Sequence, residues 1–246
     1  MEHSIIKLAK IFQEYKIYPN RKYKNNTPVH WFLQDFKEDS YTKDLKEFLK
    51  YQDYNTNRRG ADLPWWGEKY FSSEKGIRVM IISQDSLAED AKSIVFYANM
   101  LPHPNEFKNW EKKFKVKKSF YDSWNKFSNL LESWNMDFRF IYMTDARKVY
   151  KQSDKKNFDN KLCKELLIKE IDICNPELII CLGRSAINLL YPEFGKNKLY
   201  ELINSQLYHK NRPVCVSYFP TGRGFNNFKK YRIKISECIS KYLNVV

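Results

Sequence analysis

Four short apolar runs alternate with helical patterns over the C-terminal two thirds of the chain. The runs are rich in β-branched and aromatic residues and cover 77–82, 138–143, 177–182 and 213–218. Apolar side chains recur at helical spacing between and after them, at 119–134, 161–174 and 226–243. Apolar strands that alternate with amphipathic helices are typical of a parallel sheet covered by helices on both faces. We therefore predict an α/β fold of three layers (αβα) with a central four-stranded parallel sheet.

The N-terminal part of the chain follows a different pattern. Apolar side chains recur at helical spacing within 1–16 and again near 40–52, with a basic, turn-rich stretch between them. The stretch NTNRRGADLPWWG that follows is rich in Asn, Gly and Pro, and it predicts a loop. We therefore predict a mostly helical N-terminal extension over residues 1–75 and the α/β domain over residues 76–246.

The chain is strongly basic and rich in aromatic residues. Its 43 Lys and Arg against 29 Asp and Glu give a net charge of +14, and 16% of its 246 residues are aromatic. This balance favours a polyanionic partner, although a coding bias toward Lys and Asn would also raise the charge. The sequence has neither an apolar run of about 18 residues nor the pattern of a signal peptide. We expect nucleic acid rather than a membrane as the partner, and a cytoplasmic location.

Cysteine and histidine spacing argues against a metal site. The five cysteines form no C-x-x-C pair and lie in apolar patterns, at positions 163, 174, 181, 215 and 238. No metal-ligand spacing is formed by the four histidines, at positions 3, 30, 103 and 209. We predict reduced, buried thiols and neither a metal, an iron–sulfur cluster nor another cofactor.

Polar, charged and Gly-containing segments follow all four predicted strands. They read SQDSLAED (83–90), TDARK (144–148), GRS (183–185) and FPTGRGFNN (219–227). In open α/β sheets the ligand binds beyond the carboxyl ends of the strands, so these segments are the candidate site. None contains G-x-G-x-x-G or a Walker A loop, which disfavours a dinucleotide or P-loop nucleotide site.

The strand ends also match a known superfamily in order and spacing. With their strands they read VMIISQDS, YMTDARK, NPELIICLGRSAINLL and YFPTGRGFN. Over residues 76–243 the chain thereby resembles the uracil-DNA glycosylase superfamily. The resemblance implies an enzyme that flips a base out of DNA and hydrolyses its N-glycosidic bond.

Two positions depart from the superfamily pattern. Asp145 stands where the second motif usually has Asn, and Phe219 stands where the fourth motif usually has His. The cysteine set of the iron–sulfur branch is absent as well. The chain therefore resembles a divergent, cluster-free member whose substrate need not be uracil.

The resemblance implies that Gln84 and Asp85, at the first strand end, carry the catalysis. Hydrolysis of an N-glycosidic bond passes through an oxocarbenium-like sugar, which a carboxylate near C1′ stabilises while it orients water. Asp85 has the position that the superfamily uses for this role, and the Gln84 amide helps to fix the base or the loop. The alternative is that Asp85 caps the following helix, a position that Asp favours.

Asp145 and an aromatic ring are the candidates for binding the base. An ionised carboxylate accepts from the exocyclic amino group of cytosine, whereas it meets uracil O4 acceptor against acceptor. Asp145 therefore indicates a cytosine-type or modified base, unless it only pairs with Arg147 or Lys148. Phe96, or its neighbour Tyr97, has the spacing of the superfamily's stacking ring, but either ring is equally consistent with a core position.

The candidate DNA contacts lie after the third and fourth strands. Arg184 and Ser185 begin a helix, where phosphate binds readily. Small residues in loop 219–227 allow close approach to the DNA backbone. The candidate DNA-contacting side chains of this loop are Thr221, Arg223 and Phe225. An ordinary turn that caps the last helix is the alternative. Trp65 and Trp66 either extend the DNA groove or recognise a bulky group on the base, or they are core residues.

These features predict a monomeric, monofunctional DNA glycosylase that leaves an abasic site. No catalytic Lys is evident, so strand cleavage is not expected. Excision of normal cytosine would damage the host genome, so we predict a modified cytosine as the substrate. Hydroxymethylated or glucosylated cytosine in phage DNA fits this requirement and implies antiviral defence. The alternatives are a repair glycosylase for uracil or another deaminated base, and a catalytically weak nucleic-acid-binding protein on the same fold.

Overall fold

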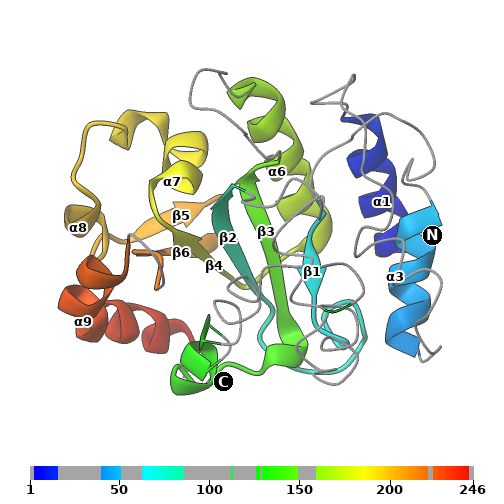
Figure 1. Cartoon of the computed structure of the whole chain (residues 1–246), viewed down its shortest axis with the longest axis horizontal. Helices are drawn as coiled ribbons and strands as arrows, with labels where there is room; N and C mark the ends of the chain where they lie inside the picture. Colours follow the sequence, from blue (N-terminus) through cyan, green and yellow to red (C-terminus); the bar gives the residue numbers. More distant parts are fainter. Residues whose placement is uncertain are drawn as a thin grey trace.

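The protein has a mixed α/β architecture built on one six-stranded sheet (Figure 1). A computed structural model describes residues 3–15, 40–50, 63–85, 112, 126–127, 129–148, 159–220 and 224–243. Helices lie on both faces of the sheet, and α1 and α3 lie beside its β1 edge (Figure 1). The predicted three-layer α/β fold with helices in the N-terminal extension is confirmed.

The strands are β1 (Trp65–Trp66), β2 (Val79–Asp85), β3 (Ile141–Arg147), β4 (Leu178–Leu182), β5 (Leu207–His209) and β6 (Arg212–Ser217). Their order in the sheet is β1-β3-β2-β4-β6-β5. The four central strands run parallel, as predicted, and the two edge strands pair antiparallel with their neighbours. β1 lies within the predicted N-terminal extension, so residues before position 76 contribute to the sheet.

One predicted strand is displaced along the chain. Residues 138–140 form a 3-10 helix, and β3 begins only at Ile141. The Asp137 side chain accepts a hydrogen bond from the Arg139 backbone N–H (3.0 Å), and this cap starts the turn within the apolar run. β3 then pairs with β2 through its polar end, so Asp145 lies inside a strand rather than in the loop after it.

The main helices are α1 (Ser4–Glu14), α3 (Ser40–Lys50), α6 (Asn160–Cys174), α7 (Arg184–Leu190), α8 (Leu199–Leu202) and α9 (Phe225–Leu243). On one face of the sheet, the Tyr142 hydroxyl in β3 donates to Glu170 Oε1 in α6 (2.5 Å). On the other face, the Sγ atoms of Cys215 in β6 and Cys238 in α9 lie 2.9 Å apart. α6 and α9 therefore cover opposite faces, and α1 packs on α6.

A buried aromatic cluster joins the N-terminal helices to the sheet. The rings of Phe12 and Phe48 lie 5.7 Å apart, and Phe48 lies 5.4 Å from Trp66, which stacks on Tyr142 at 6.3 Å. We call these four residues the N-terminal aromatic cluster. Each is at most 1% exposed. The burial of these rings accounts for the attachment of α1 and α3 to the sheet.

Trp65 and Trp66 are core residues, and a role for them at the DNA surface is wrong. Each is 1% exposed. Because neighbours in a strand point to opposite faces, Trp66 reaches the cluster while Trp65 packs on Phe138, with centroids 4.5 Å apart. Neither ring can contact a group on a DNA base without unfolding this edge of the sheet.

A buried ion pair lies beside the cluster. Lys148 and Glu170 are both 0% exposed and joined by a salt bridge. The Lys148 ammonium also donates to Thr144 Oγ1 and lies 5.5 Å from the Phe12 ring centroid. Because Glu170 also accepts from Tyr142, the charges are paired and hydrogen-bonded, as burial requires. The network holds the carboxyl end of β3 against α6 and α1.

The prediction that the cysteines are reduced thiols is confirmed. All five are free, four of them are buried, and Cys238 is partly buried. Among the described residues, no group of three or more His, Cys, Asp or Glu side chains is arranged to hold a metal ion. No helix in the described part of the chain is long and apolar enough to span a membrane.

Candidate active site

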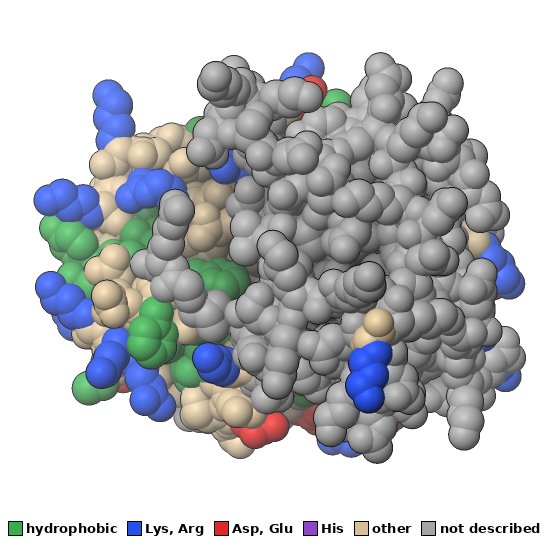
Figure 2. All heavy atoms as spheres, viewed as in Figure 1, with side chains coloured by type: hydrophobic (Ala, Val, Ile, Leu, Met, Phe, Trp, Pro, Cys, Tyr) green, Lys and Arg blue, Asp and Glu red, His purple; other side chains and the backbone are tan. Residues whose placement is uncertain are grey.

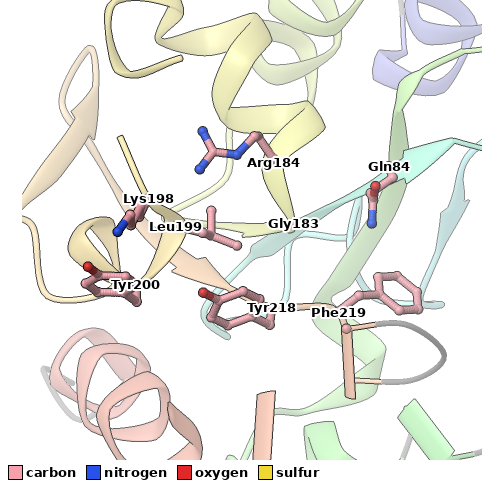
Figure 3. A pocket seen from close by; sticks show the side chains of 9 residues that line it. Gln84, Gly183, Arg184, Lys198, Leu199, Tyr200, Tyr218 and Phe219 are labelled. Atoms are coloured by element: carbon pink, nitrogen blue, oxygen red, sulfur yellow. The ribbon is translucent and has the colours of Figure 1, made fainter. Parts of the chain in front are cut away.

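A pocket of about 430 Å³ lies at the carboxyl ends of β2, β4 and β6 (Figure 3). Gln84 enters it from β2, Arg184 from the start of α7, and Phe219 from the end of β6. Ligands of open α/β sheets bind at this edge. We call it the strand-end pocket.

Gly183 opens the strand-end pocket between β4 and α7. Its φ is +78°, a conformation that disfavours any side chain. Its N–H donates to Ser217 O (2.7 Å), which ties the end of β4 to β6. A Cβ at this position would lie 3.0 Å from Gln84 Nε2. A larger residue would therefore displace the Gln84 amide from its place in the pocket.

Asp145 is a buried carboxylate at the carboxyl end of β3. It is 2% exposed, and it is level with Ser83 of β2 in the pairing register. The same register pairs Asp85, the last residue of β2, with Arg147. Because strand residues alternate between faces, positions 83 and 145 fall on one face and Gln84 on the other. Asp85 and Asp145 thus lie near the ends of adjacent strands, and position 145 lies on the face opposite to α6.

Arg184 reaches the strand-end pocket while Ser185 does not. The Arg184 guanidinium donates to the carbonyls of Gly195 (3.0 Å) and Asn197, which fix it on the turn after α7. Ser185 is only 7% exposed. Of the two predicted phosphate ligands, Arg184 is therefore the one that the fold brings to a ligand-accessible surface.

The described residues that follow β6 line two pockets. Phe219 and Gly224 line the strand-end pocket, whereas Pro220 and Phe225 line a second pocket of about 620 Å³ between α9 and residues 126–133. A Cβ at Gly224 would lie 2.5 Å from Phe219 O, so the close approach of these two backbone positions requires Gly at 224. We call the second space the α9 pocket. Both pockets border the segment predicted to contact DNA.

Basic side chains surround both pockets. Lys126, Lys229 and Arg232 line the α9 pocket, and Arg184 and Lys198 line the strand-end pocket. Figure 2 shows Lys and Arg side chains gathered, with hydrophobic ones, over the side of the molecule that holds α7, α8 and α9. A positive surface of this kind attracts phosphate groups.

The two aromatic residues of the predicted loop differ in exposure. Phe225, at the start of α9, is 49% exposed and lies at the mouth of the α9 pocket. Phe219 is half-buried and lines the strand-end pocket. The remaining predicted contacts lie outside the described residues: Phe96, Tyr97, Thr221 and Arg223.

Three tyrosines at the strand-end pocket were not found from the sequence. Tyr200 in α8 and Tyr218 after β6 line the pocket, and Tyr231 in α9 stacks against both. They come from three separate elements, and no spacing along the chain relates them. Only the position of Tyr218 at the fourth strand end was a usable signal.

A parallel α/β sheet with a basic, aromatic pocket at the carboxyl ends of its strands is typical of the α/β proteins that bind an anionic ligand at that edge. The family model of the uracil DNA glycosylase superfamily matches residues 70–244, and the chain belongs to this superfamily. No curated protein matches the chain. Membership supports DNA glycosylase activity, the hydrolysis of N-glycosidic bonds in DNA.

Proposed function

We propose that the protein is a monofunctional glycosylase that excises a modified cytosine from DNA. Asp145 carries this proposal, because it puts a buried carboxylate where the superfamily usually has an Asn amide. An ionised carboxylate only accepts hydrogen bonds. It can accept from the N4 amino group of cytosine, whereas uracil presents the acceptor O4 at that position.

Asp85 is the proposed catalytic carboxylate. It ends β2 next to the strand that holds Asp145, so one flipped nucleotide can meet both residues. The carboxylate stabilises positive charge on the sugar and orients a water, whose oxygen bonds to C1′ as the bond from C1′ to the base nitrogen breaks. One proton of the water passes by way of the carboxylate or the solvent to the departing base, the other stays on the new C1′ hydroxyl, and the product is an abasic site.

The choice of a modified cytosine as the substrate rests on the need to spare the host genome. A glycosylase that accepted unmodified cytosine would attack every cytosine that it could flip. A substituent that the host genome lacks removes this hazard, and hydroxymethylated or glucosylated cytosine of phage DNA has such a substituent. We therefore propose a role in antiviral defence.

The test is an abasic-site assay on oligonucleotides that differ at one base. The panel holds cytosine, hydroxymethylcytosine, glucosylated hydroxymethylcytosine and uracil, with Asp85→Asn protein as the blank. We expect excision of a modified cytosine and none of unmodified cytosine. Excision of uracil alone would replace the proposal with a repair glycosylase.

Phe219 favours a second candidate, a nucleic-acid-binding protein with weak activity. The residue lines the strand-end pocket where the superfamily usually has His, and a phenyl ring cannot donate a hydrogen bond to the departing base. The same panel separates the two candidates. Binding without excision of any base would support this second function and reject the first.

A further inference from the structure

Three tyrosine rings form a continuous stack at the outer end of the strand-end pocket. The centroids of Tyr200 and Tyr231 lie 6.0 Å apart with planes 9° from parallel, and those of Tyr218 and Tyr231 lie 5.7 Å apart at 20°. Tyr231 thus supports both of the other rings from α9. We call these residues the tyrosine stack.

The tyrosine stack faces an open space. Tyr200 is 42% exposed, although it is a large aromatic residue, and both Tyr200 and Tyr218 line the pocket. In Figure 3 their side chains lie along one side of the pocket and the Arg184 side chain lies on the opposite side. Burial raises the pKa of Tyr218, so its ring carries a neutral phenol at physiological pH.

Cations surround these rings. Lys198 Nζ lies 5.8 Å from the Tyr200 centroid, and Lys230 Nζ lies 5.4 Å from the Tyr231 centroid. Arg184 is held toward the pocket by the carbonyls of Gly195 and Asn197. The described lining of the pocket contains no Asp or Glu, and nearby Glu201 accepts from the Lys198 backbone N–H (3.1 Å).

Aromatic rings beside cations suit a ligand that has both a planar group and an anionic group. A nucleotide has both properties, because its base stacks on a ring while its phosphate meets Lys or Arg. A neutral sugar would use the rings but leave the cations without a partner. A base inside a duplex already has neighbours on both faces, so it cannot cover Tyr200.

We propose that the tyrosine stack binds an unpaired nucleotide of the DNA strand, beside the nucleotide that is excised. The site makes single-stranded or locally opened DNA the preferred form of the substrate. The inference rests on the proposed function only in taking DNA as the ligand. It assigns Tyr200 to base stacking, and Arg184 and Lys198 to the phosphates of the same strand.

The experiment measures fluorescence anisotropy of a short, labelled oligothymidylate, which contains no base for excision. Tyr200→Ala should weaken binding by about 5- to 100-fold, as the loss of one base–aromatic stack does. Tyr200→Trp should restore it. Lys198→Ala should lower the slope of log affinity against log salt by about one unit, while Tyr200→Ala leaves the slope unchanged.

Two controls separate stacking from other effects. Tyr208→Ala removes a ring that is 49% exposed on β5 and does not line the pocket, and it should bind as wild type does. A strand of abasic spacers has the same phosphates without bases, so wild type and Tyr200→Ala should bind it equally. Unchanged binding of oligothymidylate by Tyr200→Ala, or an equal loss on the spacer strand, would overturn the proposal.

The stacking site and the proposed function can be rejected independently of each other. If Tyr200→Ala binds the single strand normally while modified cytosine is still excised, the stacking site is rejected and the glycosylase stands. If stacking is observed but no base on the panel is excised, the nucleotide site stands and the glycosylase is rejected.

Discussion

Two regions of the molecule combine aromatic rings with lysine side chains, and they differ in what surrounds the charge. Beside the N-terminal aromatic cluster, the fully buried Lys148 ammonium lies 5.5 Å from the Phe12 ring centroid and pairs with Glu170. In the tyrosine stack, Lys198 lies 5.8 Å from Tyr200, and both side chains are exposed. Aromatic and lysine side chains thus form a buried core in the first region and an exposed surface, the proposed nucleotide site, in the second.

The comparison shows why aromatic content alone does not locate a DNA site. A ring becomes part of the core when other side chains enclose it, as Phe48 of α3 and Tyr142 of β3 do at Trp66. A ring is accessible to a ligand when much of it remains in water, as at Tyr200, which is 42% exposed. Changes in the first region should therefore alter folding, and changes in the second should alter binding.

The largest expected effect is on stability in the cluster. Trp66→Ala should lower the free energy of unfolding by about 3–5 kcal/mol, because it removes a fully buried ring. Tyr200→Ala should cost only about 1 kcal/mol, since the ring is half in solvent. Urea denaturation followed by circular dichroism measures both. Equal losses of unfolding free energy in the two variants would contradict the proposed difference between the regions.

Removing one partner of the buried ion pair should have a similar cost. Glu170→Gln leaves the Lys148 ammonium buried without its counter-charge, so stability should fall by about 3–5 kcal/mol. The double variant Lys148→Met with Glu170→Leu removes both charges, and it should recover much of that loss. A single variant as stable as wild type would show that the pair is not sealed from water.

Substitution of Asp85, the proposed catalytic carboxylate, should change the excision rate rather than stability. Asp85→Asn should lower the excision rate by about 100-fold or more and leave DNA affinity intact. Single-turnover abasic-site formation and anisotropy titration with the same oligonucleotide separate the two quantities. Near wild-type turnover in Asp85→Asn would remove Asp85 from the mechanism.

The smallest expected effect is on the salt dependence of binding. Arg232→Gln, at the α9 pocket, should reduce the salt slope by about one unit if it contacts one phosphate. Lys210→Gln is the matched control, because Lys210 pairs with Asp172 (2.6 Å) at the β5–β6 turn, away from the carboxyl ends of the strands. Identical slopes for the two variants would place the DNA elsewhere.

The sequence predicted the parallel strands because each one is a continuous apolar run. It misplaced the start of β3 because Phe138 and Phe140 continue that run, although the Asp137 cap turns them into a 3-10 helix. The edge strands β1 and β5 have two and three residues, too few for a periodic signal. Short elements of this kind are defined by their partners rather than by their own sequence.

The candidate site was only partly accessible to sequence reasoning. Gln84, Asp85, Asp145 and Arg184 lie at or just beyond the carboxyl ends of strands, which the sheet brings together. The tyrosine stack could not be predicted, because α8, the end of β6 and α9 meet only in the folded chain. Likewise, nothing local to Trp65 and Trp66 showed that both faces of the β1 edge would be covered.

The most direct test of the central claim is the effect of Asp145→Asn on base preference. Initial excision rates are measured for wild type and the variant on matched oligonucleotides with glucosylated hydroxymethylcytosine or uracil. We expect wild type to act on the modified cytosine, and the side-chain amide of the variant to lower this activity and allow weak activity on uracil. An unchanged ratio of the two rates would show that Asp145 does not bind the base, and would reject a preference for modified cytosine set by this residue.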